Sequence, residues 1–204
     1  AHQRMVVTTD TLIAGVHFQP VDTPEDIAAK VLRVNLSDLA AMGADPMSYT
    51  LSAALTDSIG EDWLARFSHS LASDQVRYGV TLIGGDTVAT PGPLSFGVTA
   101  FGSVEEGSEL RRSSARPGDL IFVSGTIGDA ALGLLALRGE LTDLDAAVAE
   151  FLIDRYLRPQ PRTRLGCRLT GLAHAAADIS DGLVADLGHI ADASKLAATL
   201  DSSL

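Results

Sequence analysis

Residues 35–46 read NLSDLAAMGADP, and they close a helix that can be followed back to its start. The segment Thr23-Pro24-Glu25-Asp26 supplies a hydroxyl N-cap, a proline at the first helical position and acids in the first turn. The helix is predicted to end near Met42, because Gly43 is a natural C-terminal cap. Apolar residues recur at the three- and four-residue spacing of one buried face, at Ile27, Ala28, Val31, Leu32 and Leu39.

Two polar side chains interrupt the end of this helix. Asn35 falls on the apolar face and Asp38 lies three residues further on, so the two side chains are neighbours. An ionised carboxylate at the edge of an apolar face is costly unless it has a partner. One interpretation is that Asp38 binds a metal ion and that Asn35 orients it. The alternative is that Asp38 is a solvated residue at the rim of the helix.

Composition limits the classes of function. The chain has 204 residues, 46% of them hydrophobic, which allows one large domain or two small ones. Its 26 acids and 15 bases give a net charge of -11, which disfavours nucleic acid and anionic membranes as partners. An anionic substrate would therefore need a divalent metal ion at the contact. Because there is no apolar run of about 18 residues and no signal-peptide pattern, a cytoplasmic protein is expected.

The chain is expected to alternate strands and helices and to form two domains. In the first part, strands are predicted over residues 5–9, 48–55, 80–83 and 94–101, with a second helix over 61–78. A turn signal at Arg116-Pro117-Gly118-Asp119 marks the boundary region. After it the sequence predicts a strand over 120–124, helices over about 130–138 and 145–157, a third helix, and a closing helix that ends near residue 193. The pattern indicates an α/β (α+β) protein with domains over 1–112 and 113–204.

Three aspartates each follow a predicted short apolar strand, namely Asp10, Asp86 and Asp178. Ligands of open α/β sheets collect outside the carboxyl ends of the strands, so these acids are expected to meet there and Asp38 to reach the same place. Mg²⁺ binds carboxylate oxygens and leaves room for phosphates. A single aspartate after a strand is more often the start of a turn. The whole set, with the glycines of GGDT (84–87) and DISDG (178–182), favours a metal and phosphate site.

The remaining motifs are less specific. His17, seven residues after Asp10, is open to two interpretations, a substrate contact or a structural histidine. His69 and His189 lie in predicted helices with no acid cluster expected nearby, and no role is predicted for them. Neither GxxxxGK[ST] nor GxGxxG occurs, so a nucleotide phosphate would be held by metal and backbone.

Five motifs, in this order, resemble the thiamine-monophosphate kinase family of the aminoimidazole-ribonucleotide-synthetase-like superfamily. They are TTDTLIAGVHF (8–18), NLSDLAAMGADP (35–46), GGDT (84–87), RRSSARPGD (111–119) and DISDGL (178–183). The resemblance implies ATP-dependent phosphorylation of thiamine monophosphate with several Mg²⁺ ions and no covalent nucleophile. By motif it implies metal ligands at Thr9, Asp10, Asp38, Asp86, Asp178 and Asp181. It also implies contacts to ATP from Gly85, Asp86, Arg112 and Ser180, and to the substrate from His17.

The resemblance also implies the architecture and the length. Two domains of mixed sheet and helices are expected, with the first-domain sheets paired in a homodimer, because the short strands show no device that protects a sheet edge. Family members begin before residue 1 and continue beyond Leu204, so the chain is expected to lack both ends. The alternatives are another ATP-dependent synthetase of the superfamily, a metal-dependent phosphohydrolase and a non-catalytic binding module.

Overall fold

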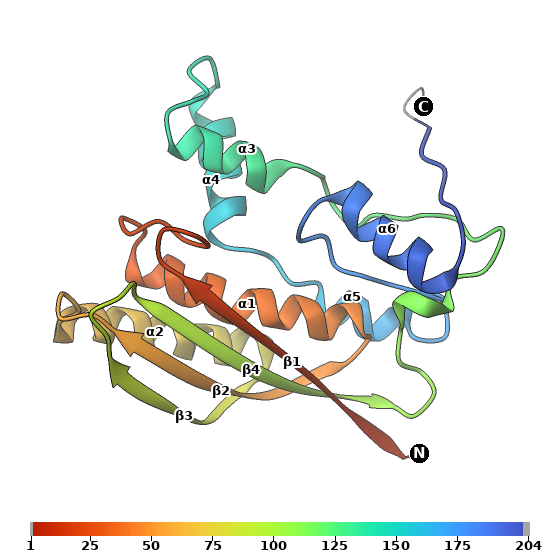
Figure 1. Cartoon of the computed structure of the whole chain (residues 1–204), viewed down its shortest axis with the longest axis horizontal. Coiled ribbons are helices and arrows are strands. Elements are labelled where there is room, and N and C mark those ends of the chain that lie inside the picture. The colour runs from red at the N-terminus through yellow and green to blue at the C-terminus, as the bar shows by residue number, and fades with distance from the viewer. Residues whose placement is uncertain (1, 202–204) are drawn as a thin grey trace.

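The computed structural model describes residues 2–201. The first part contains β1 (Gln3–Ile13), α1 (Pro24–Ala41), β2 (Asp45–Leu55), α2 (Glu61–Tyr78), β3 (Thr81–Ala89) and β4 (Ser95–Glu105). The second part contains the short 3₁₀ helix η1 (Arg112–Ser114), α3 (Asp129–Leu137), α4 (Ala146–Leu157), α5 (Thr163–Leu169) and α6 (Leu183–Ser194) (Figure 1).

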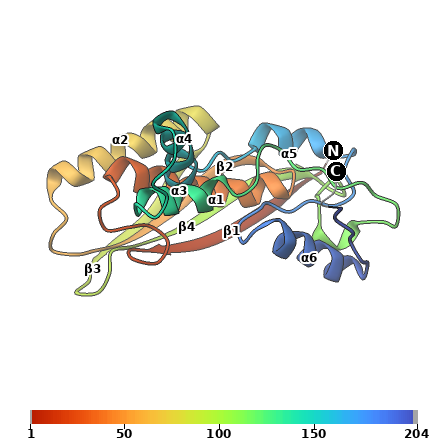
Figure 2. The same cartoon turned by 90° about the horizontal axis from the view of Figure 1, so that it is seen from above.

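The four strands form one mixed sheet in the order β1-β4-β2-β3. Strands β2 and β3 are parallel, and β4 is antiparallel to both β1 and β2. Helices α1 and α2 lie side by side against one face of this sheet (Figures 1 and 2). The predicted α/β architecture with a mixed sheet is confirmed.

Helix α1 forms as the sequence predicts. The Thr23 hydroxyl accepts a hydrogen bond from the backbone N–H of Asp26, so the N-cap is made. The helix ends at Ala41, and Gly43 follows with a φ of 71°, a left-handed conformation that glycine adopts without a steric penalty. Helix α2 has the predicted bounds, and Gly79, with a φ of 69°, caps its C-terminal end.

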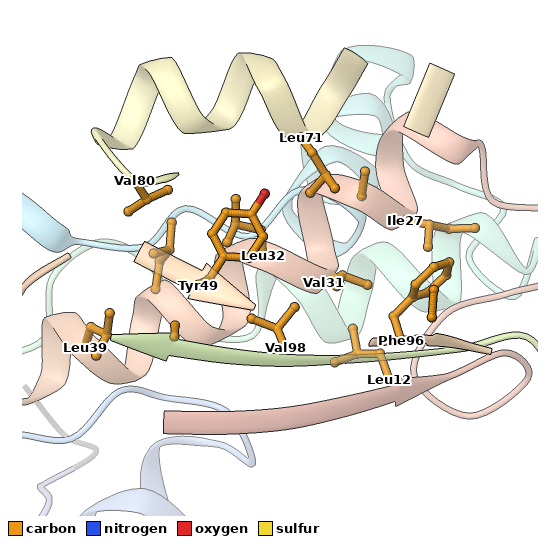
Figure 3. Packing of buried hydrophobic residues seen from close by; sticks show 14 of the residues in the cluster. Leu12, Ile27, Val31, Leu32, Leu39, Tyr49, Leu71, Val80, Phe96 and Val98 are labelled. Atoms are coloured by element: carbon orange, nitrogen blue, oxygen red, sulfur yellow. The ribbon is translucent and has the colours of Figure 1, made fainter. Parts of the chain in front are cut away.

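The core lies between the two helices and the inner face of the sheet. Figure 3 shows Val31 and Leu32 of α1 packed against Tyr49 of β2 and Val98 of β4, all of which are buried. Burying each such aliphatic side chain contributes roughly 1.5–3 kcal/mol. This layer fixes which side of each strand faces α1, and so which residues of β1 meet the end of that helix.

Strand β1 is longer than predicted, and its side chains alternate between the two faces of the sheet. Leu12 is buried on the inner, helix-covered face, and Thr8 and Asp10 lie on the same side because they are four and two residues before it. Thr9 and Thr11 are exposed on the outer face. Asp10 therefore lies inside a strand and does not follow one, which corrects the prediction.

The second part of the chain is mainly helical. Residues 120–124, predicted as a strand, have irregular backbone, and Phe122 in this segment is 86% exposed. Helices α3 and α4 pack together as a pair that projects from the rest of the molecule (Figure 1). Helix α5 packs on the end of α1, where a Cβ atom on Gly166 would lie only 2.2 Å from the carbonyl oxygen of Ala40. Within residues 2–201, no helix is long and apolar enough to cross a membrane.

Candidate active site

A cavity lies at the C-terminal end of α1, between the two parts of the chain. It has a volume of about 430 Å³, and β1, the end of α1, η1, the segment before DISDG and the end of α6 line it. Figure 2 shows α6 on the β1 side of the molecule. Among the predicted site residues, the cavity wall includes Asp38, Arg112 and Asp178.

Asp38 is half-buried and is held by strand β1. Its Oδ2 accepts a hydrogen bond of 2.6 Å from the hydroxyl of Thr8. Burial raises the pKa of the Asp38 carboxyl above its ordinary value, and the nearby Asp10 carboxylate raises it further, while Thr8 and Arg112 act in the opposite direction. Asp38 is therefore not a solvated residue of the helix rim, and β1 and α1 together bring Asp10 and Asp38 to one place.

Asp178 completes this group of acids from the second part of the chain. Burial raises its pKa, the Asp38 carboxylate adds to that effect, and the hydroxyl of Ser37 partly offsets it. The predicted meeting of Asp10, Asp38 and Asp178 is thus found. Thr8 and Ser37 were not predicted as site residues, although Thr8 has the same strand parity as Asp10 and Ser37 precedes Asp38 directly.

This arrangement has the chemistry of a divalent metal site. The carboxylates of Asp38 and Asp178, whose burial and mutual repulsion disfavour the charged form, would be relieved by a cation. Carboxylate and hydroxyl oxygens are the hard donors that Mg²⁺ prefers. The residues present therefore fit Mg²⁺, with Asp10, Asp38 and Asp178 as the side chains that would hold it.

Arg112 is one of two arginines in the cavity wall, together with Arg111, and η1 and α6 fix its backbone. The hydroxyl of Ser194 donates to the carbonyl oxygen of Arg112 at 2.7 Å and accepts from the N–H of Ala115 at 3.1 Å. A guanidinium at the edge of a cavity with acids is suited to bind an anion that the metal also contacts.

Asn35, which was predicted to orient Asp38, and Thr9, which was predicted to bind the same metal ions, do not contact Asp38. Asn35 is fully buried, and its Nδ2 donates to the carbonyl oxygen of Val31 at 3.0 Å, so the prediction that Asn35 orients Asp38 is wrong. Thr9 points to the opposite face of the sheet from Asp38, and its hydroxyl donates to the carbonyl oxygen of Val98 at 3.1 Å. The strand alternation gives the reason, because Thr8 and not Thr9 faces α1.

Asp86 and Gly85 lie away from this cavity within the chain. Both are inside β3, and β4 and β2 separate β3 from β1, a backbone distance of about 14 Å at three interstrand spacings. The register pairs Asp86 with Ser52, Ser52 with Gly97 and Gly97 with Thr11, which places Asp86 on the outer face and Asp10 on the inner face.

The glycine of GGDT also has a structural explanation. A Cβ atom on Gly85 would lie 1.9 Å from the carbonyl oxygen of Leu51, so a side chain does not fit between β3 and β2. The expectation that Asp10, Asp86 and Asp178 meet outside three strand ends is therefore wrong for Asp86. Asp178 also lies in irregular backbone and follows no strand.

The backbone of the DISDG loop is held by Asp186, for which no role was predicted. Oδ2 of Asp186, which is 4% exposed, accepts the backbone N–H groups of Ser180, Asp181 and Gly182. Asp181 is exposed, and its carboxylate, that of Asp186 and the ring of His189 place ligand atoms within 4.8 Å of one another. His189 therefore does lie beside acids, contrary to the prediction.

His17 lies near the other end of the inner face. It follows β1, and its Nδ1 accepts the backbone N–H of Ile13 at 3.0 Å, which leaves the proton of the neutral ring on Nε2. Its carbonyl oxygen lies 3.4 Å from Nζ of Lys30, eight residues before Asp38, or roughly 12 Å along α1. The exposed Nε2–H of His17 and the acid group thus lie apart along one side of the molecule.

Two family models match this chain. The N-terminal domain of AIR synthase related protein matches residues 1–104, and the C-terminal domain matches residues 116–203. The chain belongs to the AIR synthase related family. Residues 105–115, which contain η1, lie between the two matches.

Several proteins similar to this AIR synthase related chain are named thiamine-monophosphate kinase. Thiamine-monophosphate kinase of Escherichia coli K12 is 51% identical over 202 residues, which cover 99% of this chain and 61% of that protein. The crystal structure of thiamine-monophosphate kinase from Stenotrophomonas maltophilia K279a has a TM-score of 0.88 at 50% identity, over 96% of this chain and 62% of that one. The structure of AaThiL complexed with AMPPCP and TMP has a TM-score of 0.88 at 34% identity, over 95% and 61%.

The AIR synthase related chain spans about three fifths of the length of the curated relatives that it matches. The site described above is therefore built from the part that the chain shares with them. Its acids, its arginine and its histidine all lie within the matched residues.

Proposed function

We propose that the protein carrying this chain transfers the γ-phosphate of ATP to thiamine monophosphate and forms thiamine diphosphate. The observation that carries the proposal is the pair Asp38 and Asp178 in the wall of a cavity that Arg112 also lines, with Asp10 beside Asp38. Support comes from the 51% identity to a thiamine-monophosphate kinase and from the similar structure that holds AMPPCP and TMP. The predicted cytoplasmic location is part of the same proposal.

The chemistry asks for positioning and charge neutralisation more than for a protein nucleophile. The acceptor is a phosphate whose oxygen is ionised near neutral pH, so no strong general base is required. When bound by the aspartates, several Mg²⁺ ions would relieve the repulsion between the two phosphates.

The residues of the chain hold the two reactants in line. Asp10, Asp38 and Asp178, with Asp181, provide the oxygen ligands, and Thr8 keeps Asp38 in place through its hydrogen bond. Arg112 binds nucleotide phosphate at the cavity wall. His17, with its donor fixed on Nε2, contacts the thiamine end of the acceptor, away from the acids.

The proposal also includes a homodimer that uses the outer face of the sheet. No helix within the described residues covers that face, and apolar side chains on it are exposed, Met5 by 68% and Val7 by 53%. Pairing two such faces would bury these side chains and close the sheet edges. Because Asp86 lies on the outer face, we assign Asp86 and Gly85 to ATP and metal binding in the cavity of the second copy.

Mixing two inactive variants tests that assignment. In a dimer of Asp38→Asn with Asp86→Asn, one cavity keeps both aspartates only if they come from different subunits. An equal mixture allowed to exchange subunits should then recover about a quarter of normal activity, because half of the dimers are hybrids with one intact site each. No recovery despite proven exchange would show that Asp86 does not act across the dimer.

The reaction itself is tested by phosphate transfer from ATP to a panel of acceptors, with and without Mg²⁺. ADP formation should require thiamine monophosphate, depend on Mg²⁺ beyond what forms Mg-ATP, and invert a chiral γ-phosphorus. Activity with another acceptor would favour a different synthetase of the superfamily. ADP release without any acceptor would indicate a phosphohydrolase, and nucleotide binding without turnover a binding module.

A further inference from the structure

A buried carboxylate fills the concave side of the DISDG loop. Asp186 lies in the first turn of α6, and its Oδ2 is 2.9 Å from the nitrogen of Ser180 and 3.1 Å from those of Asp181 and Gly182. The side chain is 4% exposed. Three successive N–H groups thus converge on one oxygen of a residue that comes later in the same chain.

Converging backbone N–H groups of this kind attract anions. Successive backbone N–H groups that point to one centre form a concavity for an anion, and the start of a helix adds to the positive potential there. Hydrogen bonds from these groups to a carboxylate are charge-assisted and stronger than neutral ones. In this chain the anion is internal, because Asp186 already occupies the position that a phosphate oxygen would take.

We propose that Asp186 is a positioning residue that occupies the anion site of the loop itself, so that the loop presents its acidic side chains to cations and withholds its N–H groups from phosphate. The proposal rests on the proposed function for the identity of the cations. It also changes the role expected of the glycine in DISDG, because the N–H of Gly182 is bound to Asp186 and not available to a nucleotide.

The surroundings of Asp186 support a role toward the metal ligands. Its carboxylate lies within 4.8 Å of ligand atoms of Asp181 and His189. Its charge also contributes to the raised pKa of Asp178, after burial and the Asp38 carboxylate. Asp186 therefore holds the backbone from Ser180 to Gly182, adds negative charge near Asp178 and Asp181, and is itself buried.

Three variants test the proposal. Asp186→Asn keeps the shape and one neutral acceptor, Asp186→Ala removes the acceptor, and Asp192→Asn neutralises an exposed aspartate on the same helix as the matched control. The first readout is amide hydrogen exchange of Ser180, Asp181 and Gly182 in metal-free protein. Exchange should be faster in Asp186→Asn, faster again in Asp186→Ala, and normal in the control, with the rest of α6 unchanged.

The second readout is Mn²⁺ affinity, measured by electron paramagnetic resonance without nucleotide or thiamine compounds. Residues that orient metal ligands typically change metal affinity 10- to 100-fold when altered, so the Kd for Mn²⁺ should rise at least about 10-fold in Asp186→Asn. The third readout is binding of inorganic phosphate, which should appear in Asp186→Ala and not in the unaltered protein. An adventitious ion only, bound equally by the control, would contradict the vacated anion site.

The outcomes separate this proposal from the proposed function. If thiamine monophosphate is not a substrate, the exchange, Mn²⁺ and phosphate measurements still decide the role of Asp186. Normal Mn²⁺ affinity in a folded Asp186→Asn protein would overturn it. If Asp186→Ala does not fold, the Asp186→Asn protein keeps the test decisive, since its exchange rates and Mn²⁺ affinity compare a charged with a neutral acceptor.

Discussion

Replacing Asp74 by alanine should strongly destabilise the protein, because it leaves the guanidinium of Arg33 buried without a bonded carboxylate. Arg33 of α1 and Asp74 of α2 form a bidentate pair, with Nε to Oδ2 and Nη2 to Oδ1 distances of 2.7 Å each. Their side chains are 9% and 4% exposed. A third bond, 3.5 Å long, runs from Arg33 to the carbonyl oxygen of Pro159 and does not supply charge.

The expected loss follows from the burial of both charges. Removing one partner of a buried ion pair typically costs about 3–5 kcal/mol, because the other charge stays desolvated and unpaired. For a chain of this size, each kcal/mol lowers the melting temperature by about 2–4 °C, so Asp74→Ala should lower it by about 6–20 °C. The double variant Arg33→Met/Asp74→Leu should recover most of that loss, since it removes both charges and keeps an apolar contact.

Urea unfolding measures the effect, with the fluorescence of Trp63, the one tryptophan of the chain, as the probe. The matched control is Arg66→Ala, which breaks an exposed pair between the same two helices, where Arg66 Nε lies 2.7 Å from Glu25 Oε1. Solvent screens that pair, so the midpoint should move little. A shift for Asp74→Ala no larger than that for Arg66→Ala would refute the reasoning, as would a double variant less stable than either single one.

Further predictions concern the site and its surroundings. Asp38→Asn should abolish most turnover, and unchanged turnover, with His69→Asn as control, would contradict this. The same variant should make the metal-free protein more resistant to urea at pH 7, because burial raises the pKa of Asp38 and disfavours its charged form. In the metal-free protein, the raised pKa values of Asp38 and Asp178 mean that the folded state binds more protons above pH 3.8, so their contribution to stability should fall as the pH rises through those values, and Asp38→Asn should flatten that profile. Lys30→Met should stabilise the protein at pH 7 by about 1–2 kcal/mol in urea titrations, because burial lowers the pKa of Lys30 from 10.5 to about 8. The lost contact of Nζ with the Tyr156 ring offsets part of the gain, and a less stable variant would show that this contact dominates.

The helices of the first part could be predicted because their signals are local. Thr23 and Gly43 mark the ends of α1 within one turn, and the apolar spacing between them identifies the buried face. The strand over 120–124 could not be decided in this way. Its apolar run is compatible with a strand only if a partner lies beside it, and strand pairing is set by residues far away in the sequence.

The sequence indicated which acidic residues come together better than it indicated how they are arranged. Asp10, Asp38 and Asp178 do come together, but Asp10 does so from inside a strand, through its parity and not through a strand end. Like Asp10, Asp86 follows an apolar run and precedes a threonine, and only the order and register of the four strands place it on the other face. The role of Asp186 was hidden because it depends on backbone N–H groups, which leave no trace in a side-chain motif.

The proposed activity depends on which residues of Thr8-Thr9-Asp10-Thr11 face α1, and the alternation along β1 decides this. Among the described strands β1 pairs only with β4, so its register depends on that one ladder, on Leu12 in the core and on the bond between Thr8 and Asp38. A slip of one residue would exchange every inward and outward side chain, yet Thr-Thr-Asp-Thr would still place hydroxyls on both faces and keep a well-bonded sheet. One inserted or deleted residue between Met5 and Asp10 would thus give a protein that keeps its secondary structure but has no phosphate-transfer activity.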